Sequence, residues 1–342
     1  MANALYPALR RLLFALEPER AHSVALAALS GAHATGLLRS SHDDGSAVSL
    51  LGLSFPNRIG LAAGYDKNAR YVDALGALGF GFIEVGTVTP KPQGGQARPR
   101  LFRIERASAL INRMGFPNEG AAAIGARLQR RTYRGVCGVN IGKNAATVME
   151  EATRDYVDCF RAVARHADYV AINVSSPNTK ELRRLQQVEQ LRPVLEALLE
   201  ERAQLQGSTG RRVPLLVKVS PDLPVDALVS IAQLMRELRI DGVIATNTTL
   251  SRVGVAGMRH ADEEGGLSGA PLLPLSLRAV RVLRSSLDAS TPVIAAGGID
   301  SARAALDAIA AGANLVQIYT GLVYRGPRLL REINLALRSL RP

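Results

Sequence analysis

The sequence of 342 residues contains no tryptophan and only two cysteines, and aromatic residues make up 4% of it. So few aromatic side chains argue against a surface on which single-stranded nucleic acid stacks. Two cysteines cannot supply the set of thiolates that an iron–sulfur cluster or an all-cysteine zinc site needs. We therefore expect no metal site, and we expect Cys137 and Cys159 to be packing residues in a protein of the reducing cytoplasm.

Long apolar runs are also missing. No stretch reaches the ~20 apolar residues that a membrane-spanning helix requires, and the N-terminus lacks the early basic cluster and apolar run of a secretory signal. We expect neither feature in this protein.

Basic residues are in excess, with 42 Lys and Arg against 30 Asp and Glu, which gives a formal net charge of +12. Such a charge draws a protein toward nucleic acid or an anionic membrane. The arginines are dispersed and form no single stripe, so an ordinary basic surface remains the competing explanation.

Past residue 50 the chain repeats a short β-rich apolar run, a loop and a helical stretch. Eight such units in about 290 residues predict a closed α/β barrel of the (β/α)₈ TIM type. The predicted strands are Ile59–Ala63, Phe82–Val88, Val136–Ile141, Tyr169–Val174, Pro214–Val219, Gly242–Thr246, Val293–Ala296 and Leu315–Tyr319. The predicted helices include Arg70–Leu78, Tyr156–His166, Val225–Leu238, Ala302–Ala310 and Arg328–Leu340.

A doubly wound open sheet would show the same alternation, and the placement of polar residues counts against it. An open sheet gathers its ligands at a single switch point, whereas a barrel brings the carboxyl ends of all strands around one mouth. Polar residues and a glycine lie at or near the carboxyl ends of seven different predicted strands, at Asp66, Lys67, Asn140, Asn173, Ser176, Lys218, Asn247, Gly298 and Tyr319.

Residues 1–40 break this rhythm and are predicted to form an amphipathic helical extension, and residues 41–342 form the barrel domain. Leucines and Tyr6 share one face of a first helix, and Pro18 opens a second helix through Ala21–Leu29. A polar linker, Ser40–Ser46, follows. The two helices either cover the bottom of the barrel or lie on a membrane surface, which the neighbouring Arg10 and Arg11 would favour.

Two glycine-containing segments close the last two predicted strands, at Gly297-Gly298 and at Tyr319-Thr320-Gly321. In barrels of this type the loops after strands seven and eight often bind phosphate through backbone N–H groups. A Gly-Gly pair alone is usually a plain turn, and its position after the seventh strand is what points to phosphate.

Lys218 stands inside an otherwise apolar strand. Burying its ammonium would be costly unless it meets an anion, although it could instead reach solvent at the strand end. We favour an anion, namely a flavin ring that gains negative charge on reduction.

The segment Asn173–Thr179 leaves the fourth strand with two asparagines and Ser176 between them. Asparagine amides offer paired donors and acceptors that suit a planar ligand with alternating carbonyl and N–H groups. Without further context, the segment is more typical of a capped turn.

Together with Lys218, six segments occur in an order that resembles the class 2 dihydroorotate dehydrogenases, the quinone-dependent and membrane-associated ones. They are Ala62–Asn68, Asn112–Phe116, Asn173–Thr179, Thr246–Thr249, Gly265–Gly269 and Ala296–Ile299. The resemblance implies one flavin mononucleotide (FMN) per chain, bound by Ala63, Gly64, Tyr65, Asp66, Lys67, Thr87, Asn140, Asn173, Lys218, Thr246, Gly269, Gly298, Tyr319 and Thr320. It implies a dihydroorotate site formed by Lys67, Asn112, Arg113, Met114, Gly115, Phe116, Asn173, Asn178, Asn247 and Thr248.

The resemblance also implies the chemistry. Ser176 would be the catalytic base for the proton on carbon 5 of dihydroorotate while hydride leaves carbon 6 for the flavin, and a membrane quinone would then reoxidise the flavin. Class 1 relatives place cysteine where this chain has Ser176. His22 and Arg103 resemble residues that line a quinone tunnel, although His22 taken alone is more typical of a helix surface. The expected protein is a monomer, peripheral on the cytoplasmic face of the membrane, and serves pyrimidine biosynthesis.

Two alternatives remain. A tRNA-dihydrouridine synthase would suit the positive charge, but that family uses a catalytic cysteine and a helical RNA-binding domain after the barrel, which we do not expect here. A non-catalytic flavin-binding protein at the membrane would have no need of Ser176, Lys67 and Asn178, all of which are present.

Overall fold

The computed structural model describes residues 2–38 and 47–338. Parallel strands close into a barrel in the order β3-β4-β7-β8-β9-β10-β12-β13, and β13 pairs back onto β3. Because this sheet has no free edge, the predicted (β/α)₈ barrel is confirmed and the open sheet is excluded. The barrel strands are β3 (Ile59–Leu61), β4 (Phe82–Val88), β7 (Val136–Ile141), β8 (Tyr169–Asn173), β9 (Leu215–Val219), β10 (Gly242–Ala245), β12 (Val293–Ala296) and β13 (Leu315–Ile318).

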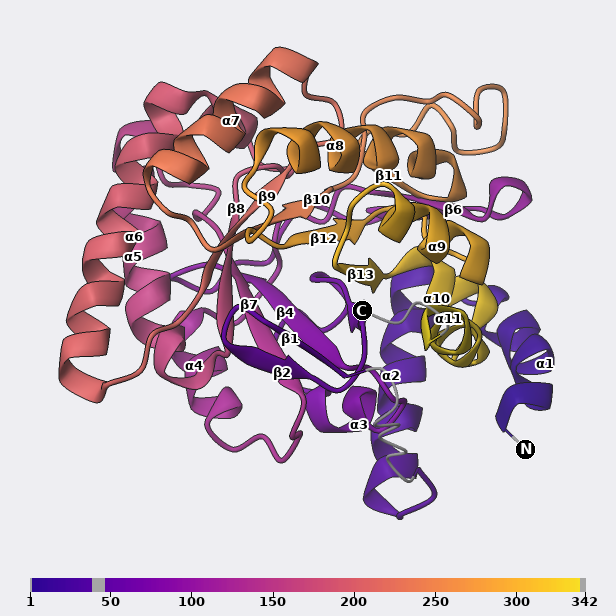
Figure 1. Cartoon of the computed structure of the whole chain (residues 1–342). Coiled ribbons are helices and arrows are strands. Elements are labelled where there is room, and N and C mark those ends of the chain that lie inside the picture. The colour runs from indigo at the N-terminus through magenta and orange to yellow at the C-terminus, as the bar shows by residue number, and fades with distance from the viewer. Residues whose placement is uncertain (1, 39–46, 339–342) are drawn as a thin grey trace.

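Helices cover the outside of the barrel (Figure 1). In α7, for example, buried Leu228, Ile231 and Met235 recur at helical spacing and form the face that packs inward. The outer helices are α3 (Val72–Gly76), α4 (Ala121–Leu128), α5 (Ala152–Val163), α6 (Val188–Thr209), α7 (Val225–Glu237), α8 (Leu273–Ser286), α9 (Ala302–Ala310), α10 (Thr320–Arg325) and α11 (Arg328–Arg338). Short 3₁₀ helices span Glu105–Ala107, Met149–Glu151, Ala164–His166, Leu182–Gln186 and Ala270–Leu272.

Several strands end earlier than their apolar runs predict. The strand β3 ends at Leu61 rather than Ala63, and β13 ends at Ile318 rather than Tyr319. The chain leaves the ladder at these points, and the following residues turn over the mouth of the barrel. The apolar run continues past the last paired residue, so hydrophobicity alone does not show where the strand pairing stops.

An antiparallel pair that the sequence did not reveal closes the amino-terminal end of the barrel. It consists of β1 (Val48–Leu50) and β2 (Leu53–Phe55). Phe55 packs edge-to-face on Phe82 at a centroid distance of 5.4 Å, within a cluster that includes the first residues of several barrel strands. The bottom of the barrel is therefore covered by this pair and not by the N-terminal helices.

A second small sheet lies beside the mouth. Its antiparallel order is β11-β6-β5, formed by β5 (Leu101–Ile104), β6 (Ala109–Asn112) and β11 (Gly266–Gly269). The pairing of Gly266 with Asn112 brings together two loops that are far apart in the sequence. The sheet thus builds one wall of the space above the barrel.

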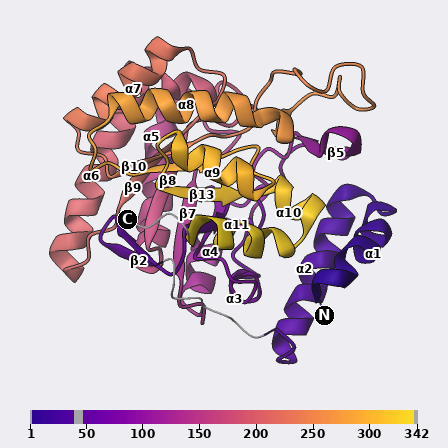
Figure 2. The ribbon, with the colours of Figure 1, turned by 45° about the vertical axis from the view of Figure 1, so that its right-hand side comes forward.

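The N-terminal extension forms α1 (Ala2–Phe14) and α2 (Pro18–Ala34), which lie side by side at the edge of the barrel (Figures 1 and 2). The Tyr6 hydroxyl donates to the Val323 carbonyl at 2.7 Å, and Arg10 donates to the Tyr324 carbonyl at 2.9 Å. Both acceptors belong to α10, which follows β13, so the extension sits near the carboxyl ends of the strands. The predicted linker Ser40–Ser46 and the last residues of the predicted helix Arg328–Leu340 lie outside the described residues.

Candidate active site

A cavity with about 1100 Å³ of empty space, partly open to solvent, lies at the mouth of the barrel. Its wall combines apolar side chains with a few convergent polar groups, which is typical of a cofactor or small-molecule site. Most residues predicted from the sequence meet in its wall, namely Ala63, Gly64, Lys67, Thr87, Asn112, Met114, Gly115, Phe116, Asn173, Ser176, Asn178, Lys218, Thr246, Asn247, Thr248, Gly269, Gly298, Tyr319 and Thr320.

A chain of side-chain amides crosses one side of the cavity. The Asn173 amide donates to Thr87 Oγ1 at 2.9 Å and to Asn140 Oδ1 at 3.0 Å, and its oxygen accepts from Asn247 at 3.2 Å. These bonds fix which face of each amide can meet a ligand. The cavity therefore offers oriented donors and acceptors from three different strand ends.

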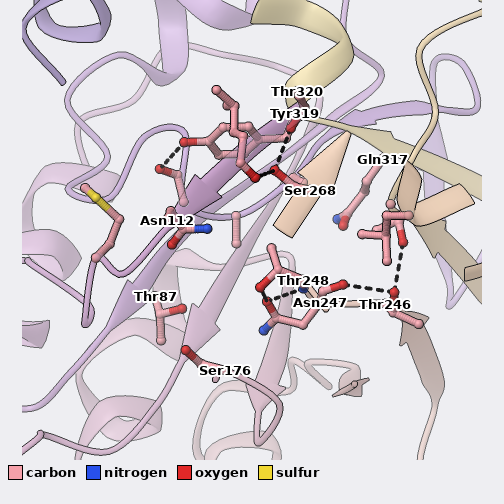
Figure 3. A pocket seen from close by; sticks show the side chains of 18 of the residues that line it. Thr87, Asn112, Ser176, Thr246, Asn247, Thr248, Ser268, Gln317, Tyr319 and Thr320 are labelled. Carbon is pink, nitrogen blue, oxygen red and sulfur yellow. Dashed lines mark hydrogen bonds between the residues drawn. The ribbon is translucent and has the colours of Figure 1, made fainter. Parts of the chain in front are cut away.

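Ser176 is buried in the cavity wall. Its oxygen accepts a hydrogen bond of 3.2 Å from the backbone N–H of Asn178. Such a bond stabilises the oxygen as negative charge develops on it, which helps a hydroxyl to act as a base. Figure 3 shows Ser176 at the base of the view, with Thr87 nearby and Asn112 above it.

Lys67 supplies a cation to the same cavity. Its ammonium donates to the Gly64 carbonyl at 2.7 Å. Burial lowers the pKa of Lys67 to about 8, with Glu19 and Asp66 opposing that shift and Arg100 adding to it. Lys67 therefore switches between a cation and a neutral amine near neutral pH, and its charge is available to an anionic ligand.

Glycines and hydroxyls surround the end of the cavity next to β12 and β13. Ser268 and Thr320 lie with their hydroxyl oxygens 2.8 Å apart, and Figure 3 shows them facing each other near Tyr319. Gly298 has a φ of +79°, and an added Cβ there would collide with the Leu273 backbone. Backbone groups and small hydroxyls can therefore come close to a ligand at this end of the cavity, as the binding of an anionic phosphate requires.

An unsatisfied acceptor also lies in the wall. Gln317 projects from β13 into the cavity lining, and its Oε1 is buried without a hydrogen-bond partner. Buried polar atoms are normally paired, so a ligand donor is the natural complement. Figure 3 shows Gln317 on the side of the cavity that faces Thr246.

A second, largely apolar cavity of about 500 Å³ lies between the N-terminal helices and the barrel. It shares Leu101, Leu110 and Tyr319 with the first cavity, so the two are adjacent. The predicted residues His22 and Arg103 both line it. The N-terminal extension thus forms one wall of a space that lies next to the main cavity.

The two predicted polar residues of this second cavity, His22 and Arg103, each contact a backbone carbonyl. His22 Nε2 lies 2.9 Å from the Tyr65 carbonyl, which can only accept, so this nitrogen carries the proton. Burial lowers the pKa of His22 to about 4, which keeps the ring neutral at pH 7. Arg103 stacks on the Phe14 ring at 4.4 Å and donates to the Leu16 carbonyl at 2.9 Å.

Four predicted residues do not line the main cavity. Arg113 turns outward to Glu263 at 2.8 Å, and Asp66 accepts backbone N–H bonds within its own loop, including one of 2.7 Å from Tyr71. Tyr65 lines the second cavity. Asn140 lies behind the wall and donates to the fully buried Glu84 at 2.9 Å.

Sequence reasoning missed Ser268 and Gln317 in the wall and Glu84 behind it. The signal for the last two was present, because Glu84 is the only charged residue of its strand and Gln317 the only polar residue of its own, as Lys218 is. Cys137 and Cys159 are free and buried in the core, as predicted.

Across residues 2–38 and 47–338, no group of three or more His, Cys, Asp or Glu side chains is arranged to hold a metal ion. No helix in the same part of the chain combines the length and apolarity needed to cross a bilayer.

Comparison with known proteins gives the same assignment over nearly the whole chain. A sequence model described as dihydroorotate dehydrogenase matches residues 46–340. The protein named dihydroorotate dehydrogenase (quinone) of Nitrosospira multiformis is 51% identical over 96% of this chain and 94% of its own. The protein of the same name from Leptothrix cholodnii is 52% identical over 99% of this chain and 100% of its own.

Solved structures extend the likeness to three dimensions. The crystal structure of DHODH from Eimeria tenella in complex with ferulenol has a TM-score of 0.87 at 39% identity and covers 94% of this chain and 90% of its own. The ligand-free form from the same organism has a TM-score of 0.85. The barrel, the order of its motifs and these relatives together establish that the chain belongs to the dihydroorotate dehydrogenase family.

Proposed function

We propose that the main cavity binds FMN and dihydroorotate together, and that quinone reaches the flavin through the second cavity. The reaction is the oxidation of dihydroorotate to orotate in pyrimidine biosynthesis, with a quinone as electron acceptor. Family membership sets aside the dihydrouridine synthase alternative.

The chemistry of the cavity fits FMN. Hydroxyls and glycines at one end suit a phosphate, and a buried lysine and oriented amides at the other suit a polar ring. The unpaired Oε1 of Gln317 can accept from a donor on the cofactor. The proposed ligand set is Ala63, Gly64, Tyr65, Asp66, Lys67, Thr87, Asn140, Asn173, Lys218, Thr246, Gly269, Gly298, Tyr319 and Thr320. Tyr65, Asp66 and Asn140 would act through the backbone or through their neighbours, because they do not line the cavity.

Dihydroorotate carries a carboxylate and a ring with amide N–H and carbonyl groups, which match the charge and amides around Ser176. Lys67 would pair with the carboxylate. The other proposed substrate residues are Asn112, Arg113, Met114, Gly115, Phe116, Asn173, Asn178, Asn247 and Thr248. Arg113 would act by holding the Asn112–Phe116 loop through its ion pair with Glu263.

Ser176 would take the proton from carbon 5 of the substrate as its own hydroxyl proton passes to water at the open side of the cavity. FMN, when bound, supplies the acceptor for the hydride that leaves carbon 6. The backbone N–H of Asn178 holds the serine oxygen and stabilises the charge that develops on it. The Asn173 and Asn247 amides keep the substrate ring in one orientation, which such proton transfer requires.

Residues 1–40 would serve membrane attachment and quinone access, and residues 41–342 would form the catalytic barrel. Leu9 and Leu12 on α1 are 49% and 71% exposed, with Arg10 and Arg11 beside them, which suits a helix lying on an anionic lipid surface. The neutral His22 and the stacked Arg103 would contact the quinone head group. We place the protein as a monomer on the cytoplasmic face of the membrane.

The observation that carries the proposal is the meeting of Ser176, Lys67 and Lys218 in one cavity. The test is an absorption spectrum of the purified protein, followed by anaerobic addition of dihydroorotate. A flavin spectrum that bleaches and then recovers with a soluble quinone analogue is expected. Protein that cannot be loaded with FMN would overturn the proposal, and loaded protein that dihydroorotate does not bleach would favour a non-catalytic flavin-binding protein.

A further inference from the structure

A carboxylate lies inside the barrel behind the wall of the main cavity. Glu84 belongs to β4, in which every residue is buried, and it has no exposed surface. A buried carboxylate is costly unless it is paired and hydrogen-bonded. Its place in an otherwise apolar strand therefore calls for an explanation beyond packing.

Four neighbouring side chains from different strands hold this carboxylate. Oε1 accepts from Asn140 of β7 at 2.9 Å and lies 3.5 Å from the Lys218 ammonium of β9. Oε2 accepts from the Tyr169 hydroxyl of β8 at 2.9 Å and from the Gln317 amide of β13 at 2.8 Å. The carboxylate is thus fixed in position at the centre of the barrel.

Two of these neighbours, Lys218 and Gln317, also line the cavity, whereas Glu84 does not. The separation of 3.5 Å between Lys218 and Glu84 exceeds the ~2.7–2.9 Å of a strong charge-assisted hydrogen bond. The ammonium is therefore held near the carboxylate without being fully engaged by it, and it keeps N–H groups for a ligand in the cavity.

This arrangement changes what a ligand experiences. A lone buried ammonium would place a full positive charge beside the ligand in a medium of low dielectric constant. With Glu84 behind it, the ligand meets a lysine whose charge is partly balanced by a fixed anion. A ring that gains negative charge on reduction would be stabilised less by this pair than by Lys218 alone.

We propose that Glu84 is a positioning residue that holds Lys218 against the flavin and limits how strongly this lysine favours flavin reduction. The inference rests on the proposed function, because it assumes FMN in the main cavity. In this role Glu84 touches neither substrate nor cofactor. It acts only through Lys218 and through the Gln317 side chain.

The test is the midpoint potential of bound FMN in Glu84→Gln, measured by anaerobic spectroelectrochemical titration at a fixed pH without substrate. Glutamine has nearly the same shape, and its new amide can donate to Gln317 Oε1 once the Gln317 amide turns. Removing the anion leaves Lys218 uncompensated, so the potential should become more positive. We expect reduction to be favoured at least tenfold, a shift of about 30 mV for two electrons.

Two further variants separate charge from structure. Tyr169→Phe removes one hydrogen bond to Glu84 and leaves all charges in place, so the potential should shift by less than that amount. Glu84→Asp withdraws the anion from Lys218 and should shift the potential in the same direction as glutamine does, but by less. Glu84→Asp also decides the matter if the glutamine variant does not fold.

An unchanged or more negative potential in Glu84→Gln would overturn the inference, as would an equal shift in Tyr169→Phe. In Glu84→Asp, an unchanged or more negative potential would also overturn the inference. These outcomes are distinct from failure of the proposed function, in which the wild-type protein would not bind FMN or would not be bleached by dihydroorotate.

Discussion

The Asn178 side-chain amide donates a hydrogen bond of 3.0 Å to Oδ1 of Asn112. Asn178 follows β8 on the barrel, whereas Asn112 ends β6 in the small antiparallel sheet. The bond therefore joins two independent parts of the fold above Ser176. The loop that carries Ser176 is thereby tied to the small sheet that forms another part of the cavity wall.

The first prediction concerns the base. Ser176→Ala should still bind FMN, because the hydroxyl is one small part of a large wall. Reduction of the flavin by dihydroorotate should slow by about 10²–10⁴-fold, the usual contribution of a positioned base. Stopped-flow bleaching under anaerobic conditions measures this step apart from quinone reduction.

Ser285→Ala on the outer surface of α8 is the matched control and should bleach at the wild-type rate, because Ser285 is exposed and donates only within its own helix. If Ser176→Ala bleached as fast as this control, another group would have to be the base.

The second prediction concerns pH. Burial lowers the pKa of Lys67 to about 8, so the side chain is a cation below this pH and neutral above it. Orotate carries a carboxylate, and its Kd should rise as pH increases through 8, by up to about tenfold per pH unit if only the cation binds. Titration of the flavin absorbance with orotate at several pH values gives the measurement.

Lys67→Met should bind orotate weakly at every pH and lose this dependence. The control is Lys91→Met, at an exposed position outside the cavity, and it should keep the pH dependence of the wild-type protein. A Kd that stays constant between pH 7 and 9 in the wild-type protein would mean that no titration of Lys67 in this range controls orotate binding.

Much of the barrel was predictable because buried parallel strands leave continuous apolar runs. The run Phe82–Val88 is a strand with the predicted bounds. A charged residue in an apolar strand, such as Lys218, could also be recognised from the sequence as unusual. Even so, Glu84 and Gln317 were overlooked although they stand in similar strands, and their role depends on the side chains that they contact, which the sequence does not show.

The parts that could not be predicted depend on contacts between distant segments. The strand β6 pairs with β11, more than a hundred residues later, and both are short and partly polar. No local period reveals such a pair. The pair β1 and β2 likewise depends on a tertiary contact, because it packs against the end of the barrel, where Phe55 and Phe82 lie in one cluster.

The third prediction concerns the membrane. Leu12 is 71% exposed on α1, beside Arg10 and Arg11, and an apolar side chain there can enter the lipid interface. Leu12→Asp should bind less to vesicles that contain anionic lipid, while dihydroorotate should bleach its flavin at the wild-type rate. Co-sedimentation with vesicles and stopped-flow bleaching measure the two effects.

Leu335→Asp provides a matched control, because Leu335 is 54% exposed but lies on α11. Equal losses of vesicle binding in the two variants would mean that α1 is not the attachment surface.

The last prediction concerns the attachment of α2 to the barrel. Glu19 pairs with Arg100 at 2.7 Å, and the two side chains are only 14% and 6% exposed. Burial raises the pKa of Glu19, but the hydrogen bonds and charges of Arg100 and Arg98 outweigh it and lower the pKa overall. A lowered pKa means that Glu19 stabilises the fold above its ordinary titration range and that this contribution is lost as pH falls below it.

Glu19→Gln removes this charge and leaves Arg100 with the carbonyls of Gly94 and Gln96 as acceptors. Opening of α2 should become easier by about 2–3 kcal/mol, somewhat less than a fully uncompensated buried charge would cost. Hydrogen exchange of the α2 amides, Pro18–Ala34, measures this opening.

Glu181→Gln is the matched control. Glu181 forms an ion pair with Arg184, and the two side chains are 45% and 58% exposed, so this substitution should change the free energy of α2 opening by less than about 1 kcal/mol. If the two substitutions changed the exchange of α2 equally little, the Glu19–Arg100 pair would not be what holds the N-terminal helices to the barrel.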